Sequence, residues 1–223
     1  MVWFYSVFQF ELLGLRSIAS RQHPSFRHWV TMNYLAHLHL GGQEPEQLLG
    51  SLYGDFVKGA LAGRFSARTE EAINLHRKID AFTDSHPVVK RALGRFTITR
   101  RRYAGIALDM FFDHCLARDW DRYAETTLDA FSKRVYTVLR SEADLPERLA
   151  RIAPLIISED WLGAYGDFSM IGHGLDVISE RLSGPENLRD AFEEMTNLYV
   201  PLSSDFEEFY PSLMRFAKCG PAI

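Results

Sequence analysis

The chain has 223 residues, of which 47% are hydrophobic and 24% are charged, and its formal net charge is −4. A chain of this size and composition can bury one sizeable core without metal or disulfide staples. The acidic balance argues against nucleic acid and anionic membranes as bulk partners. The two cysteines, Cys115 and Cys219, lie far apart with no CxxC spacing. This spacing excludes a cysteine-based zinc site and gives no disulfide framework.

Residues 1–31 form an N-terminal extension with an interrupted apolar run. No Lys or Arg precedes Arg16, so the segment lacks the basic start of a signal peptide. No window of the chain approaches the roughly 18 apolar residues of a membrane span. We therefore expect a cytoplasmic protein with one functional domain over residues 32–223. The extension before it is expected to be either an added helix or a misassigned start.

Helical periodicity dominates the rest of the chain. Apolar residues recur three and four apart in nine segments, which are 45–62, 66–83, 87–96, 103–117, 126–139, 145–157, 167–182, 185–199 and 201–218. The boundaries carry helix-start chemistry, with Ser66 or Thr69 as a cap and Pro87 and Pro201 at first turns. No hairpin turn separates alternating strands, and no repeat is present. The sequence predicts an all-α fold, a single compact bundle of seven to nine helices.

Two of these helices carry acidic and histidine residues at helical spacing. His76, Asp80 and Asp84 recur every four residues and share one helix face, and Asp109 and Asp113 do the same on the other helix. Their neighbours are largely apolar, and carboxylates in such surroundings need neutralisation. Imidazole and carboxylate together suit Mn, Fe or Zn. The alternatives are a surface ion pair for the first group and a cap or buried hydrogen-bond network for the second.

Three further residues stand in apolar helical context. Asp55 follows Gly54, and a glycine within a helix loosens it locally or lets another backbone approach closely. Asp55 is a candidate ligand or base, the alternative being an exposed acid beside an ordinary kink. His37 is a candidate ligand, although a lone histidine on an apolar face is more often a satisfied core residue. His114 lies about 140° around the helix from Asp109, so we do not expect both on one ion.

A basic run follows the first acidic helix. Because an arginine guanidinium can form two parallel hydrogen bonds with a phosphate or a carboxylate, this run is a candidate docking patch for an acidic partner or a phosphate. Aromatic residues are sparse within it and the whole chain is acidic, so nucleic acid is the less favoured partner. The alternative is an ordinary solvated face. The candidate docking residues are Arg91, Arg95, Arg100, Arg101 and Arg102.

Several motifs, taken in order, resemble the acyl-carrier-protein phosphodiesterase family over about residues 32–210. The motifs are Met32–Leu40, Gly54–Gly59, His76–Asp80 with Thr83 and Asp84, Leu108–Asp109, and Asp113–His114. The resemblance implies a helical fold distantly akin to the HD-domain metal phosphohydrolases. It also implies a Mn²⁺-preferring hydrolase of fatty acid and lipid metabolism. Such an enzyme removes 4′-phosphopantetheine from holo acyl carrier protein and leaves the apo form.

With this family in view, we expect the metal to be Mn²⁺, with Mg²⁺ or Fe²⁺ as alternatives. The expected metal ligands are Asp55, His76, Asp80 and Asp109, followed in rank by Asp84, Asp113 and His37. The same four leading residues and His114 form the expected catalytic set. Two other functions stay open. One is an HD-like phosphohydrolase acting on a nucleotide or another small phosphoester, and the other is a non-catalytic helical module that binds the carrier protein.

Overall fold

The computed structural model describes residues 34–97, 101–179 and 186–219, of which residues 101–103, 177–179 and 186–190 are described by their backbone alone. Within these ranges the chain forms eleven α-helices and one short 3₁₀ helix, with no strand. The helices are α1 (Tyr34–Leu40), α2 (Pro45–Phe56), α3 (Ala67–Ser85), α4 (Pro87–Arg95), α5 (Arg101–Arg118), η3 (Trp120–Arg122), α6 (Leu128–Ser141), α7 (Glu147–Ser158), α8 (Trp161–Ala164), α9 (Phe168–Ser179), α10 (Glu186–Asn197) and α11 (Tyr199–Cys219).

The all-α prediction is confirmed, while the predicted count of seven to nine helices was too low. The shortfall comes from α1 and α8, which are too short to show a helical period in the sequence. Residues 1–33, including the predicted extension, lie outside the described part of the chain. No helix among the described residues is long and apolar enough to cross a membrane.

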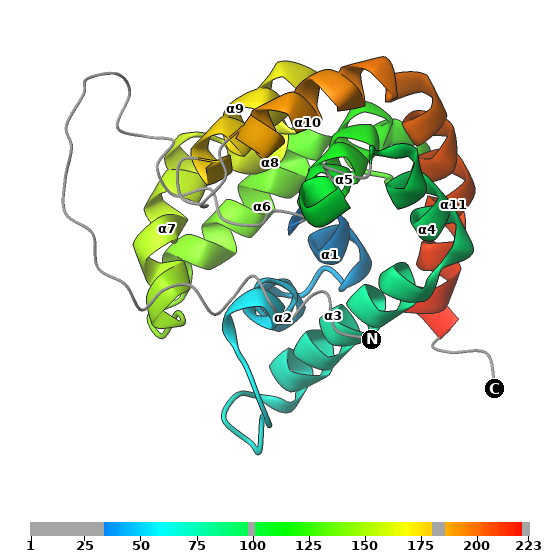
Figure 1. Ribbon diagram of the computed structural model, residues 1–223. Helices are drawn as coiled ribbons and strands as arrows, with labels where there is room; N and C mark the ends of the chain where they lie inside the picture. Colours follow the sequence, from blue (N-terminus) through cyan, green and yellow to red (C-terminus); the bar gives the residue numbers. More distant parts are fainter. Residues whose placement is uncertain (1–33, 98–100, 180–185, 220–223) are drawn as a thin grey trace.

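Helix α1 lies at the centre of the molecule, with the other helices arranged around it (Figure 1). It packs against α2, α5 and α11. Leu35 and Leu38 on this helix are completely buried. Burial of one such side chain contributes about 1.5–3 kcal/mol to folding. The same short helix carries His37, which is 2% exposed, so an imidazole is brought into the interior.

Helices α2 and α3 form the closest helix pair in the bundle. A Cβ atom on Gly50 would lie 2.5 Å from both the Thr69 carbonyl oxygen and the Ala72 Cβ. Glycine at this position therefore sets how closely the two helices approach. Helix α3 begins at Ser66, whose side chain accepts a hydrogen bond from the Thr69 amide at 3.2 Å. Helix α2 ends at Phe56 rather than at residue 62 as predicted, and the chain then turns through Gly59 at φ +77°.

Helices α4 and α11 are joined by a buried carboxylate. Asp205 is 1% exposed, and it accepts hydrogen bonds from Arg91 Nε at 2.9 Å and from Arg95 Nε at 2.6 Å. Arg91 also pairs with Glu208. Burial alone would raise the pKa of Asp205, but its bonds with the two guanidinium groups outweigh burial and lower this pKa.

Replacing Asp205 with Asn should lower the free energy of unfolding by about 1–3 kcal/mol, because charge-assisted hydrogen bonds are lost. The folded-state pKa is depressed, so the stabilisation is present above the unfolded-state value of about 3.9. It is lost as the pH falls through the lower folded-state value. Urea unfolding at neutral and acidic pH measures both effects. Glu207→Gln, which removes an exposed pair with Arg122, is the control and should cost under about 1 kcal/mol.

Candidate active site

Two histidines and a carboxylate from α1 and α3 meet in the interior. Asp80 Oδ1 lies 3.1 Å from His37 Nε2, and Asp80 Oδ2 lies 3.4 Å from His76 Nε2. Ligand atoms of these three residues all lie within 4.8 Å of one another. The two imidazole rings stack with centroids 3.6 Å apart, and Asp55 Oδ1 from α2 lies 3.6 Å from His76 Nε2. We call His37, Asp55, His76 and Asp80 the acid–imidazole cluster.

The orientation of His76 is fixed by α2. Its Nδ1 donates a hydrogen bond to the Ser51 carbonyl at 2.8 Å, which turns Nε2 toward Asp55 and Asp80. The ring lies directly on Gly54, since a Cβ there would come within 2.2 Å of His76 Cγ. The glycine identified in the sequence thus makes room for an imidazole rather than for another backbone. A backbone acceptor behind the ring is the usual support of a metal-binding histidine.

The charges in the cluster stabilise one another. Burial by itself lowers the pKa of His76, but the carboxylates of Asp55 and Asp80 outweigh it and raise this pKa. For Asp80 the balance is reversed. Burial raises its pKa, and the neighbouring His37, His76 and Lys58 lower it to a net value below the ordinary one. The cluster therefore favours ionised carboxylates beside positive charge.

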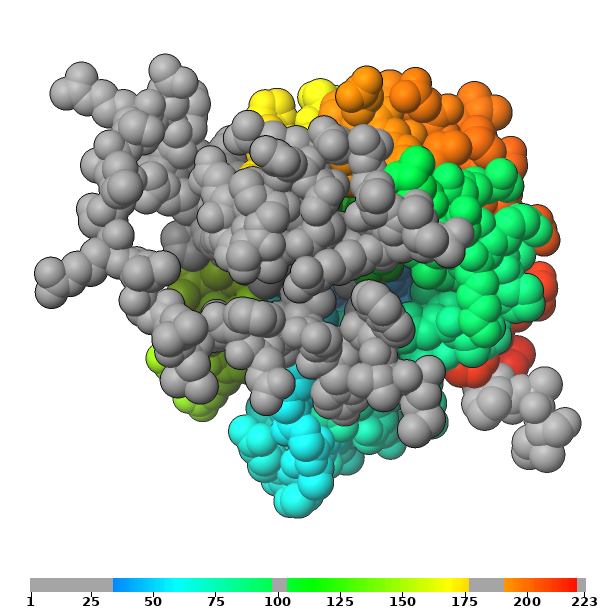
Figure 2. Space-filling model, in the orientation of Figure 1, coloured from blue at the N-terminus to red at the C-terminus, as the bar shows by residue number. Residues whose placement is uncertain are grey.

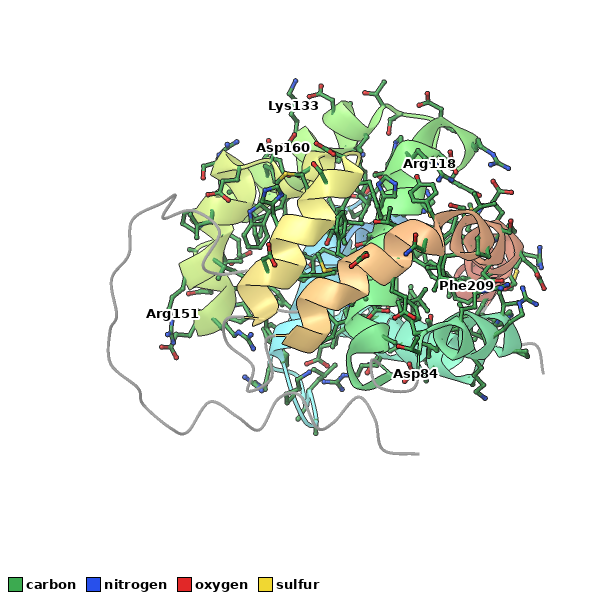
Figure 3. The ribbon with its side chains drawn as sticks, turned by 45° about the horizontal axis from the view of Figure 1, so that its top comes forward. Asp84, Arg118, Lys133, Arg151, Asp160 and Phe209 are labelled. Atoms are coloured by element: carbon green, nitrogen blue, oxygen red, sulfur yellow. The ribbon has the colours of Figure 1, made fainter. Side chains whose placement is uncertain are left out.

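Two more carboxylates border the cluster. Asp109 on α5 is partly exposed, and its pKa is raised well above the ordinary value by burial and then by Asp80, Asp113, Asp84 and Asp55. Asp84 in the last turn of α3 is exposed (Figure 3). Burial and the charge of Asp80 raise the pKa of Asp84. Both residues lie outside the tight group of three donors, although the sequence placed Asp109 among the leading ligands and His37 below it.

Asp113 has a different task from the one predicted. It is 1% exposed, and its two oxygens accept hydrogen bonds from the backbone amides of Leu35 and Ala36, each at 2.9 Å. Burial raises its pKa to about 7 although these two bonds act in the opposite direction. Both oxygens are engaged by the first turn of α1. Asp113 thus holds the helix that carries His37 and does not act as a ligand here.

Both ring nitrogens of His114 contact groups outside the acid–imidazole cluster, and its catalytic role stays a prediction. Its Nδ1 lies 2.8 Å from the Tyr165 carbonyl, and its Nε2 lies 2.8 Å from the Tyr199 hydroxyl. Arg118 donates to that same hydroxyl, so the Tyr199 hydroxyl in turn donates to His114 Nε2. Burial lowers the pKa of His114, which favours the neutral ring. Arg118, which contacts the same tyrosine as His114, lies far from Asp84 at the border of the cluster (Figure 3).

Two of the five arginines predicted to dock a partner are already engaged in ion pairs. Arg91 and Arg95 are paired with Asp205, which reduces the charge that they present to a partner. Arg100 lies outside the described residues, and Arg101 and Arg102 lie in α5 with side chains that are not described. Docking by these last three residues stays a prediction.

The acid–imidazole cluster fits a divalent cation. Imidazole nitrogen and carboxylate oxygen are the donors that Mn²⁺, Fe²⁺ and Zn²⁺ accept in proteins. Asp55 Oδ2 is buried and has no hydrogen-bond partner within the part of the chain that the structure describes. A buried carboxylate oxygen without a partner is costly unless a cation or water satisfies it. His37, Asp55, His76 and Asp80 are the residues that would hold such an ion.

Comparison with known proteins identifies the family of this chain. The family model described as acyl carrier protein phosphodiesterase matches residues 32–213. The chain belongs to the acyl carrier protein phosphodiesterase family. It is 34% identical over 189 residues to the acyl carrier protein phosphodiesterase of Serratia proteamaculans, with 84% of this chain and 98% of that relative covered. The corresponding protein of Photorhabdus laumondii is 33% identical over 189 residues, covering 84% of this chain and 96% of the relative.

No solved structure matches the chain significantly. Kinship with the HD-domain fold therefore stays a prediction. All four residues of the acid–imidazole cluster, and Asp109, lie within the matched range.

Replacing Gly54 with Ala should displace the His76 ring. A helix interior normally gains up to about 1 kcal/mol from this substitution, but here the new Cβ would overlap the imidazole. We expect lower stability and weaker Mn²⁺ binding, measured by urea unfolding and by isothermal titration calorimetry. Gly94→Ala in α4 is the matched control, because nothing lies within 4 Å of its built Cβ. A Gly54→Ala protein that is more stable and binds Mn²⁺ unchanged would contradict this packing.

Replacing Asp113 with Asn should loosen α1 and misplace His37. Asparagine keeps one acceptor oxygen, so one of the two α1 amides loses its partner at a cost of about 1–3 kcal/mol. We expect Mn²⁺ affinity to fall about tenfold, in the range found for groups that support metal ligands. Glu194→Gln is the control, because Glu194 accepts the Thr97 amide at 2.8 Å in a similarly buried setting. An equal loss of Mn²⁺ affinity in both variants would reduce Asp113 to a general stabilising role.

Proposed function

We propose that this protein is a divalent-metal-dependent phosphodiesterase of the cytoplasm. It hydrolyses the bond between 4′-phosphopantetheine and the serine of holo acyl carrier protein, giving apo acyl carrier protein. The observation that carries the proposal is the convergence of His37, His76 and Asp80, with ligand atoms within 4.8 Å, in a member of this family. Mn²⁺ is the proposed ion, and Mg²⁺ and Fe²⁺ are the alternatives that the same donors allow.

The residues of the cluster have distinct tasks in this proposal. His37 and His76 offer Nε2, and Asp80 and Asp55 offer carboxylate oxygens, so the ligand set combines neutral and anionic donors. A divalent cation held there supplies positive charge to the phosphoryl oxygens and makes water a stronger nucleophile at neutral pH. Ser51 and Gly54 hold His76 in place, and Asp113 holds α1. These supports keep the donors fixed before the substrate binds.

Asp109 is the proposed proton acceptor. It lies on a different helix from the cluster, it is partly exposed, and burial together with the neighbouring carboxylates raises its pKa well above the ordinary value. A carboxylate with a raised pKa is a stronger base than an ordinary one. Water attacks phosphorus and gives its proton to this carboxylate, and the bond from phosphorus to the serine oxygen breaks. The serine oxygen is protonated as it leaves, so the products are the carrier serine and free 4′-phosphopantetheine.

Mass spectrometry of holo carrier protein, after incubation with the enzyme and Mn²⁺, tests the reaction. We expect the carrier to lose the mass of the phosphopantetheine arm. Asp80→Asn and His37→Ala should lower the rate by at least about a hundredfold, because each removes a ligand or its charge. Asp129→Asn, an exposed residue that pairs with Lys133, is the control and should leave the rate unchanged.

The remaining outcomes of the same assay identify the other candidate functions. Turnover of nucleotides or other small phosphoesters, with holo carrier protein untouched, would indicate a different phosphohydrolase. Binding of the carrier without turnover and without bound metal would indicate a non-catalytic module. Two results together would show that the acid–imidazole cluster is not catalytic. The carrier protein would keep its phosphopantetheine arm in the presence of Mn²⁺, and the Asp80→Asn variant would be fully active on some other substrate.

A further inference from the structure

The connection between α2 and α3, which begins two residues after Asp55, carries positive charge. Residues 57–68, which we call the basic loop, contain Lys58, Arg64 and Arg68 and no acidic residue, in a chain of net charge −4. All three cationic residues are exposed. This segment, coloured cyan, projects from the body of the molecule (Figures 1 and 2). The basic loop is therefore a local exception to the acidic balance of the chain.

The basic loop is ordered by packing and hydrogen bonds, both within the loop and with the helices on either side of it. Leu61 is 7% exposed, and the Phe65 ring packs against Tyr53 with centroids 5.4 Å apart. The Arg64 amide donates to the Leu61 carbonyl at 3.1 Å, and the Phe65 amide donates to the Glu70 side chain at 3.3 Å. A loop that is ordered in advance loses little conformational entropy when a partner binds.

The start of the basic loop is fixed beside the cluster. Val57 follows Asp55 by two positions, and its carbonyl accepts a hydrogen bond from Arg77 Nη2 at 3.0 Å. Arg77 directly follows His76 in α3, so the start of the basic loop lies beside two residues of the cluster. A protein partner that covers about 800 Å² of surface can contact this point and the arginines farther along the loop together.

The chemistry of the proposed substrate requires such closeness. This step rests on the proposed function, in which the broken bond joins phosphorus directly to a serine of the carrier protein. The reacting phosphorus is then only one side chain away from the carrier backbone. The surface of the carrier must consequently lie against the rim of the site, since no long arm separates the protein from the bond that breaks.

The two basic surfaces of the protein differ in how far their charge is neutralised. Arg91 and Arg95 share the buried carboxylate of Asp205. Arg64 and Arg68 form no ion pair within the described residues, and the Arg64 guanidinium lies over the face of the Phe65 ring, 5.6 Å from its centroid. Arg68 also lies in the first turn of α3, where the helix dipole disfavours a cation. Helix stability does not account for its position.

We propose that the basic loop is the docking surface for an acidic face of the carrier protein, with Arg64 and Arg68 as its main contacts. Charges at the rim of an interface act chiefly on the rate of encounter, and their effect weakens with salt. The loop thus selects a protein-borne phosphodiester over a small free one. This assignment adds a docking surface at the α2–α3 connection to the one predicted in the α4–α5 region.

The test is the double variant Arg64→Glu/Arg68→Glu, assayed on holo carrier protein and on bis(p-nitrophenyl) phosphate with Mn²⁺. We expect KM for the carrier to rise at least about tenfold with kcat nearly unchanged, because opposite charge now repels the partner. Hydrolysis of the small diester should stay at the wild-type rate. The decline of kcat/KM with rising salt, expected for the wild type, should disappear in the variant.

Lys133→Glu/Arg151→Glu is the matched control, since it makes the same change in net charge at two exposed positions far from Asp84 in Figure 3. An unchanged KM for the carrier in the basic-loop variant, or an equal rise in the control, would overturn the proposal. Calorimetric binding of apo carrier protein to the wild type and the variant separates docking from chemistry. Binding lost in the variant supports the docking surface even if the wild type leaves the arm intact, whereas equal binding overturns it.

Discussion

The bridge from Asp80 to two stacked imidazoles is the interaction on which the rest of the site depends. Asp80 faces His37 with one oxygen and His76 with the other, so a single carboxylate joins α1 to α3. Buried imidazoles at a centroid separation of 3.6 Å would repel each other if both were charged. The carboxylates of Asp80 and Asp55 offset this repulsion. A divalent cation that binds through Nε2 would take neutral rings, so binding of the ion and loss of any proton from His76 are linked.

The two histidines of the cluster are positioned by contacts outside it. His76 is held between the Ser51 carbonyl and the bare backbone of Gly54, and α1 is held by Asp113 at its first turn. These supports are hydrogen bonds and close packing, which leave little room for adjustment. The central position of α1 has a similar physical cause, because a helix of only seven residues depends on tertiary packing for its stability. The same packing that buries the leucines of α1 therefore also places His37 in the interior.

The helical spacing in the sequence located most of the site, and its limits have physical causes. Residues four apart on one helix were correctly placed on a common face, as with His76 and Asp80. Spacing cannot tell which acid on a helix meets a metal and which meets a backbone amide. Asp109 and Asp113 illustrate this, since only the second receives the amides of α1. His37 was ranked low because one histidine in an apolar segment gives no periodic signal, and its partners come from another helix.

The charge that the α4 arginines present to a partner could not be predicted from the sequence. A run of basic residues does not show which of them form ion pairs with distant acidic residues. Arg91 and Arg95 looked available in the sequence, yet Asp205, more than a hundred residues away, binds them both. The basic loop is shorter and less conspicuous in the sequence, but no acid within it reduces its charge. Cations near a carboxylate cluster offset part of its repulsion of an acidic partner or an anionic phosphodiester. The basic loop starts two residues after Asp55 and its two arginines form no ion pair among the described residues, whereas the arginines of α4 are paired with Asp205.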